Sequence, residues 1–151
     1  MVANIREMTA ADTPDVFSVR ISTTENSVTM VELEEEYELT PDTLAEAIKF
    51  SAKGWVCEVD GQIVGFAMGD SKSGEMTVIA VLSEFECRGI GRMLLEKVRD
   101  WLFDSGHDEI WLLTTSDPNF RAYGFYQSQG WSATGLIIEE EEAEKFVLQK
   151  K

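Results

Sequence analysis

A short glycine-containing stretch, "ECRGIGRMLLEKV" at residues 86–98, combines residue types that can bind an anion. Gly89 and Gly91 stand directly before an amphipathic helical pattern, and Arg88 and Arg92 flank them. The start of a helix carries unpaired backbone N–H groups and a partial positive charge. Because glycine has no side chain, a phosphate or pyrophosphate can approach these N–H groups closely. A tight strand-to-helix turn without a ligand explains the two glycines equally well, so both interpretations stay open on the motif alone.

Two other phosphate-binding motifs fit this stretch poorly. The dinucleotide-binding fingerprint requires a third glycine three residues after the second, and that position holds Leu94. A P-loop requires Gly-Lys followed by Ser or Thr, which does not occur here. The elements around the glycines must therefore decide what the stretch does.

Length and composition limit the possible classes of protein. The chain has 151 residues, which we interpret as one domain over residues 1–151 with a substantial core. No apolar run approaches the roughly 20 residues of a membrane span, and the first ten residues lack the apolar block of a signal peptide, so we expect a cytoplasmic protein. Cys57 and Cys87 are then free thiols, and with the single His107 they are too sparse for a metal site. The net charge of −15 argues against nucleic-acid binding and favours cationic partners.

The spacing of apolar residues predicts an α/β fold with about seven strands and four helices. The strands are expected at residues 4–8, 55–59, 62–69, 75–81, 109–114, 131–139 and 143–150. The helices are expected after Thr9 or Asp12, from Thr40 to a closing Gly54, from the glycine pair to Gly106, and within residues 118–130. A β-helix-β unit makes the strands Glu75–Val81 and Glu109–Thr114 parallel, whereas Asp60–Gly61 predicts an antiparallel hairpin, so the sheet is mixed. The acidic run 139–142 is interpreted as a solvated turn.

Two segments of this chain resemble the Gcn5-related N-acetyltransferases, the GNAT superfamily. The first, residues 86–91, follows the family pattern Gln/Arg-x-x-Gly-x-Gly/Ala. The second, "NFRAYGFYQSQGW" at residues 119–131, follows Asn-x-x-Ala-x-x-Phe-Tyr-x-x-x-Gly-Phe, with Trp131 in the final aromatic place. The order of strands and helices matches over nearly the whole chain. One departure is Glu86 in place of Gln or Arg, since a carboxylate beside a pyrophosphate is unfavourable unless it points away; Cys87 also replaces a common glycine.

The resemblance implies a binding site for acetyl-CoA, as co-substrate, between two parallel strands that splay apart. The backbone of Ile79 and Val81 would pair with the pantetheine arm, and Asn119 would reach the pantetheine or a bridging water. Backbone amides would hold the pyrophosphate, and the residues that supply them would be Arg88, Gly89, Ile90, Gly91, Arg92 and Met93. No metal ion is implied.

The resemblance also implies two catalytic residues. Tyr126 matches the family tyrosine near the thioester sulfur and is the candidate general acid; the alternative is a buried aromatic with a satisfied hydroxyl. Glu75 matches a glutamate that in some members deprotonates the amine, directly or through water; the alternative is a solvated carboxylate at a strand start. His107 is a weaker candidate base, and the amide of Val81 is a candidate to polarise the thioester carbonyl.

The expected function is transfer of an acetyl group from acetyl-CoA to a primary amine by direct attack. The acidic residues of segment 25–38 and the run 139–142 favour a cationic acceptor, either a small molecule or a peptide, although a solvated acidic surface explains them equally well. The alternatives are a non-catalytic acyl-CoA sensor and an interaction module on the same fold. We expect neither a nucleic acid nor a membrane as partner, and the family resemblance suggests a homodimer.

Overall fold

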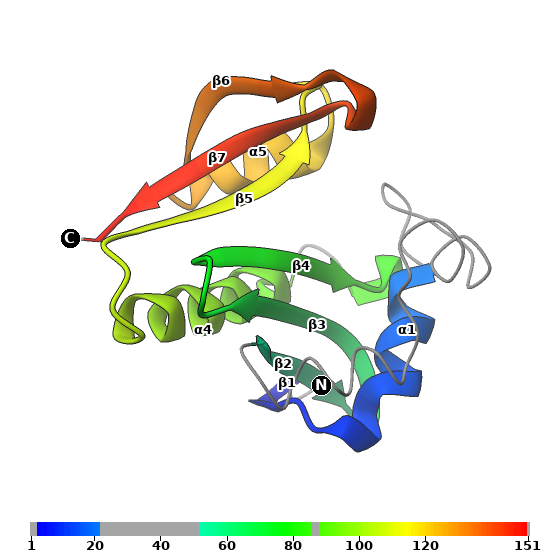
Figure 1. Ribbon diagram of the computed structural model, residues 1–151. Helices are drawn as coiled ribbons and strands as arrows, with labels where there is room; N and C mark the ends of the chain where they lie inside the picture. The colour runs from blue at the N-terminus through cyan, green and yellow to red at the C-terminus, as the bar shows by residue number, and fades with distance from the viewer. Residues whose placement is uncertain (1–2, 22–51, 86–87, 151) are drawn as a thin grey trace.

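Seven strands form one mixed sheet in the order β1-β2-β3-β4-β5-β7-β6 (Figure 1). The structure, a computed structural model, describes residues 3–21, 52–85 and 88–150. The strands are β1 (Ala3–Glu7), β2 (Ala52–Val59), β3 (Gln62–Asp70), β4 (Glu75–Val81), β5 (Glu109–Thr115), β6 (Ser132–Ile138) and β7 (Ala143–Gln149). All neighbouring pairs are antiparallel except β4 and β5, which are parallel. The predicted mixed sheet and the parallel pair are confirmed.

Three α-helices lie within the described residues: α1 (Thr13–Ile21), α4 (Ile90–Asp104) and α5 (Arg121–Ser128). In Figure 1, α4 and α5 lie behind the sheet. One buried cluster joins the sheet to α4 and α5, and a second joins it to α1. The neighbouring β2 residues Val56 and Cys57 belong to different clusters, as the alternation of side chains along a strand requires. The sheet is therefore a central layer with a core on each face.

The predicted helix over residues 40–54 is wrong at its end. Residues 52–54 belong to β2, and the earlier part of that prediction lies outside the described residues. Gly54 does not close a helix but pairs with Met68 across β2 and β3. A Cβ at Gly54 would lie 2.8 Å from Cγ of Met68 and 2.9 Å from Cε of Met8, so the glycine leaves room for two methionine side chains. In the sequence, a glycine that makes room for neighbouring side chains looks the same as a glycine that ends a helix.

The parallel strands β4 and β5 touch at one end and separate at the other. One register pair, Glu75 with Trp111, joins these fully described strands, next to a 3.1 Å bond from Trp111 N–H to the Gly74 carbonyl. Thr77 is the extra residue of a bulge, because Met68 of β3 pairs with Val78 whereas Gly69 pairs with Met76. A bulge bends and twists its strand, which helps to turn β4 away from β5. The predicted splay is confirmed and is visible in Figure 1.

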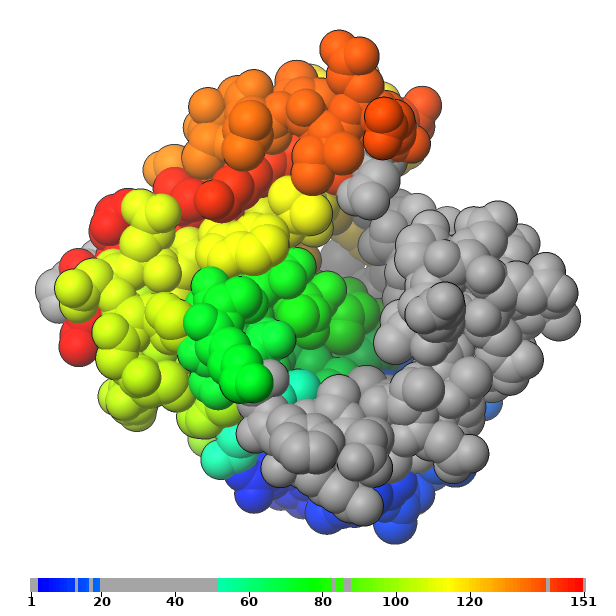
Figure 2. Space-filling model, viewed as in Figure 1, coloured from blue at the N-terminus to red at the C-terminus, as the bar shows by residue number. Residues whose placement is uncertain are grey.

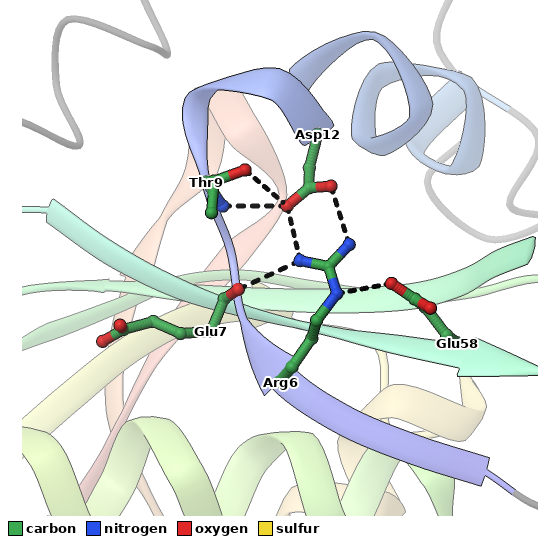
Figure 3. A network of polar contacts seen from close by, with 5 residues as sticks. All are labelled: Arg6, Glu7, Thr9, Asp12 and Glu58. Atoms are coloured by element: carbon green, nitrogen blue, oxygen red, sulfur yellow. Dashed lines mark hydrogen bonds and ion pairs between the residues drawn. The ribbon is translucent and has the colours of Figure 1, made fainter. Parts of the chain in front are cut away.

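A polar network fixes the start of α1 to the sheet edge (Figure 3). The two terminal nitrogens of Arg6 donate to the two carboxylate oxygens of Asp12, both at 2.8 Å, and Nε of Arg6 donates to Glu58. Asp12 also accepts the Thr9 N–H at 2.8 Å. The bond to Arg6 is the main reason that the pKa of the Asp12 carboxyl falls to about 2. The network therefore holds Asp12 ionised and ties the turn before α1 to β1 and β2.

Candidate functional site

The glycine turn has the geometry that the sequence predicts. Gly89 adopts φ +81°, a left-handed conformation that suits glycine, and α4 begins at the next residue. Gly89, the N-cap residue, has no side chain to cap the start of this helix. The Ile90 side chain is buried in the core, whereas Arg88 and Arg92 are exposed. Gly89 and Gly91 therefore place no side chain over the N–H groups of the first turn of α4, which suits an anion-binding turn.

The stretch of β4 beyond the Glu75–Trp111 pair offers a backbone edge that β5 does not use. Ile79 and Val81 lie on this stretch and pair with Ala67 and Gly65 of β3 on their other side. Both side chains are half-buried against the cluster that includes α4. Figure 2 shows the surface hollowed where β4 (green) and β5 (yellow) part. A ligand that pairs with the backbone of Ile79 and Val81 would enter this opening, as predicted for the pantetheine arm.

Tyr126 lies on α5 with only 6% of its surface exposed. Its ring makes edge contacts with Trp131 and Phe146, each with ring centroids 6.3 Å apart, and with Phe125 at 5.3 Å. Burial raises the pKa of the Tyr126 hydroxyl above its ordinary value, so the hydroxyl stays protonated at neutral pH. It can therefore donate a hydrogen bond but cannot serve as a base. Its role at the thioester sulfur stays a prediction.

Asn119 lies on the connection between β5 and α5. Its side chain is exposed, and its backbone N–H donates to Oδ1 of Asp117 at 2.9 Å. This local turn fixes the backbone while leaving the carboxamide at the surface. The position follows the C-terminal end of β5, on the open side of the split between the strands. The placement fits the predicted contact with pantetheine.

Glu75 lies at the closed end of the split, opposite Trp111 and Asp70. Its side chain is partly buried; desolvation, followed by the nearby Asp70 carboxylate, raises its pKa. The alternative of a freely solvated carboxylate therefore fits less well than a perturbed one. Six residue steps of about 3.3 Å separate Glu75 from Val81, roughly 20 Å along the strand. A thioester held at Val81 and a base at Glu75 could cooperate only through water or across an extended acceptor.

His107, the weaker candidate base, contacts the turn between β3 and β4. Its Nε2 contacts the carbonyl oxygen of Ser71, and its ring lies against Gly74 in the β3–β4 turn. A carbonyl oxygen only accepts hydrogen bonds, so Nε2 carries the proton. The histidine is half-buried rather than a surface residue at a helix end. Its contacts lie at the closed end of the split.

Sequence reasoning missed one buried acid near α5. Glu144 of β7 is 5% exposed and accepts hydrogen bonds from Tyr123 and Gly135. The available signal was its spacing from Phe146, since residues two apart in a strand share a face. The adjacent Glu139, Glu140 and Glu142 are exposed, as predicted for a solvated turn.

Comparison with known proteins identifies the family. Residues 16–131 match the Acetyltransferase (GNAT) family. The chain belongs to this GNAT family of N-acetyltransferases. The match includes both glycines of the turn and the whole Asn119–Trp131 segment.

The curated relatives match over part of their length. An uncharacterized N-acetyltransferase of Chlorobaculum tepidum is 35% identical over 74 residues, which are 47% of this chain and 48% of that protein. One of Archaeoglobus fulgidus is 36% identical over 85 residues, 49% of this chain and 56% of that protein. The chain thus spans about half the length of the curated relatives it matches.

Solved GNAT structures share the fold of this chain. The PaiA N-acetyltransferase of Thermoplasma acidophilum, solved in complex with coenzyme A, has a TM-score of 0.83 at 16% identity and covers 99% of this chain and 100% of that one. The ribosomal-protein-S18-alanine N-acetyltransferase of Escherichia coli has a TM-score of 0.74 at 20% identity, with 98% and 94% covered. At these sequence identities, the structural similarity shows only the fold of this chain.

Two features of other protein classes do not occur in residues 3–21, 52–85 and 88–150. No helix there is both long and apolar enough to cross a lipid bilayer. No three His, Cys, Asp or Glu side chains in these ranges gather closely enough to hold a metal ion.

Proposed function

We propose that this GNAT protein binds acetyl-CoA and transfers the acetyl group to a primary amine by direct attack. The observation that carries the proposal is the glycine-bounded start of α4 beside a pair of parallel strands that separate after one register pair. An anion-binding helix start and an open strand edge suit the two chemical parts of CoA, a pyrophosphate and an amide-containing arm. The coenzyme A complex of the similarly folded PaiA protein supports this assignment.

The binding roles follow from which groups are available. The amides of residues 88–93 would hold the pyrophosphate, with the exposed Arg88 and Arg92 adding positive charge. The backbone of Ile79 and Val81 would pair with the arm, and the Asn119 carboxamide would contact it from the far side of the split. Glu86 and Cys87, the departures from the family pattern, lie outside the described residues.

A cationic amine must lose one proton before it attacks and a second as the amide forms, and the sulfur must gain one. The amine nitrogen attacks the thioester carbon, a C–N bond forms, and the C–S bond breaks to release CoA thiolate, which takes its proton from water. A protonated Tyr126 would donate a hydrogen bond to the departing thiolate. Because a thiol is a stronger acid than this tyrosine, hydrogen bonding to the thiolate costs less than full proton transfer to it. Glu75 would accept the amine proton, through water or from an acceptor long enough to extend along β4 between Val81 and Glu75.

The acceptor in this proposal is cationic. The chain carries a net charge of −15, and three exposed glutamates stand at the β6–β7 connection. Such a field raises the local concentration of cations and steers their approach. The further acidic residues in segment 25–38 lie outside the described residues.

Calorimetric titration with acetyl-CoA, followed by free-thiol detection with a panel of amines, tests the proposal. We expect 1:1 binding and thiol release that depends on an amine, faster for cationic amines at low salt. Binding without thiol release from any amine would replace the enzyme with an acyl-CoA sensor. Absence of binding to acetyl-CoA and to CoA would leave an interaction module on the GNAT fold.

A further inference from the structure

A buried carboxylate on β7 connects two separate elements. Glu144 is 5% exposed, and glutamate is rarely buried so far unless its oxygens are paired. Here each oxygen accepts a bond from a different element. Oε1 accepts from the Tyr123 hydroxyl of α5 at 3.3 Å, and Oε2 accepts from the Gly135 N–H of β6 at 3.0 Å.

The β6 end of this connection is an irregular part of the strand. The register between β6 and β7 shifts between Ala133 and Ile137, and Gly135 within this interval has φ +80°. The Gly135 N–H donates to the Glu144 side chain. Glu144 therefore bonds to the bulge of β6 as well as to α5.

Tyr123, the α5 residue that bonds to Glu144, lies on the same face of the helix as Tyr126. Tyr123 and Tyr126 are three residues apart, and both rings contact Phe146 edge to face, with centroids 4.9 and 6.3 Å away. Phe146 lies two residues beyond Glu144 on the same face of β7. The hydroxyl bond from Tyr123 to Glu144 adds a directional contact between α5 and β7 to these ring contacts.

The protonation of Tyr123 suits this role. Burial, followed by the Glu144 charge, raises the pKa of the Tyr123 hydroxyl, which therefore stays a donor at neutral pH.

We propose that Glu144 is a positioning residue that, through Tyr123, holds α5 so that the Tyr126 hydroxyl meets the thioester sulfur. The catalytic part of this inference rests on the proposed function. Its geometric part, control of the position of Tyr126 by Glu144 and Tyr123, does not.

Tyr123→Phe is the main variant, because it removes one hydroxyl and keeps the ring on Phe146. We expect kcat to fall by about tenfold, which corresponds to about 1.4 kcal/mol in the barrier, while KM for acetyl-CoA changes less than twofold. In the Tyr126→Phe background the same change should have no further effect on kcat, since the hydroxyl being positioned is then absent. Full additivity of the two changes, or a wild-type kcat in Tyr123→Phe, overturns the proposal.

Two further variants complete the test. Glu144→Gln keeps one acceptor oxygen for two donors, the Tyr123 hydroxyl and the Gly135 N–H, so kcat should fall by up to the loss seen in Tyr123→Phe, and a wild-type kcat overturns the role of Glu144. Ser128→Ala removes another α5 hydroxyl, which donates to the Phe125 carbonyl at 2.6 Å, and should leave kcat unchanged. A loss in Ser128→Ala equal to that in Tyr123→Phe overturns the proposal in favour of general weakening of α5.

Fluorine NMR separates this inference from the proposed function. The chain has three tyrosines, so 3-fluorotyrosine labelling gives three resonances, and Tyr126→Phe assigns that of Tyr126. Tyr123→Phe should shift or broaden the Tyr126 resonance, whereas Ser128→Ala should not. An unchanged Tyr126 resonance in Tyr123→Phe overturns the positioning role, whether or not any amine is acetylated.

Discussion

Gly91 of α4 faces Phe125 of α5: a Cβ at Gly91 would lie 3.6 Å from Cζ of the phenylalanine. The glycine belongs to the turn proposed to bind the pyrophosphate, and the phenylalanine precedes Tyr126. The contact brings together the two segments by which the sequence resembles the GNAT family.

Substitutions at Gly91 test the anion site with little backbone strain. The 3.6 Å spacing is ordinary van der Waals contact, whereas Gly89 has φ +81° and would be strained by any side chain. Gly91→Glu should lower acetyl-CoA affinity at least tenfold, because its side chain blocks the anion and its charge repels it. Gly91→Ala, the control, should bind more tightly than Gly91→Glu and raise the free energy of unfolding by about 0.5–1 kcal/mol. Calorimetric titration and urea unfolding measure both; wild-type affinity in Gly91→Glu would remove the pyrophosphate assignment.

Tyr126→Phe should lower kcat by roughly 10- to 100-fold, the loss expected when one hydrogen bond to a developing charge is removed. Affinity for acetyl-CoA should stay near wild type, because the ring keeps its contacts with Trp131 and Phe146. Activity requires the protonated hydroxyl, and its pKa is raised, so titration of Tyr126 should cause no alkaline loss of kcat below pH 10. A wild-type kcat for Tyr126→Phe with the best acceptor, across the pH range, would remove Tyr126 from the mechanism.

The pH dependence of kcat/KM tests Glu75. A base acts in its deprotonated form, so kcat/KM should rise with pH through a pKa higher than that of an ordinary glutamate. Asp70→Asn removes a neighbouring charge that raises this pKa and should move the acidic limb to lower pH. If the acidic limb of the kcat/KM profile lies at the wild-type pH in both Asp70→Asn and Glu75→Gln, another group is the base.

Glu75 should also affect stability. Folding raises the pKa of the Glu75 carboxyl. The free energy of unfolding therefore falls as the pH rises from the unfolded to the folded pKa of this group. Glu75→Gln removes this penalty, so at pH 7 it should unfold at a higher urea concentration than wild type. An equal or lower midpoint at pH 7 would contradict the burial cost assigned to this side chain.

Asp12 should make the opposite contribution. Its pKa falls to about 2 on folding, so its stabilisation is complete above the unfolded value near 4 and is lost as the pH falls toward 2. The shift corresponds to about 2 kcal/mol at pH 7. Asp12→Asn should therefore lower the free energy of unfolding by about that amount at pH 7 and flatten its pH dependence between pH 4 and 2. Urea unfolding at several pH values measures it; an unchanged slope would contradict the role of Arg6 in Figure 3.

Features that depend on a few neighbouring residues could be predicted from the sequence alone. The Asp60–Gly61 turn is one, since both residues adopt the positive φ angles that such a hairpin requires. The glycine turn before α4 is another, because the positive φ of Gly89 and the apolar stripe of α4 follow from local residue types. The parallel direction of β4 and β5 also followed, because a helix crossover connects them.

Features that join distant parts of the chain were decided by the tertiary structure. Gly54 has the local context of a helix end, but the methionines that need its space, Met8 and Met68, are brought together by the pairing of three strands. The place where β4 and β5 part depends on a bulge at Thr77 and on the single pair of Glu75 with Trp111. Glu144 reads as one more acid in an acidic segment until α5 and β6 enclose it. Turn geometry and helical periodicity are set by bonded neighbours, whereas strand register and burial are set by which distant surfaces exclude water together.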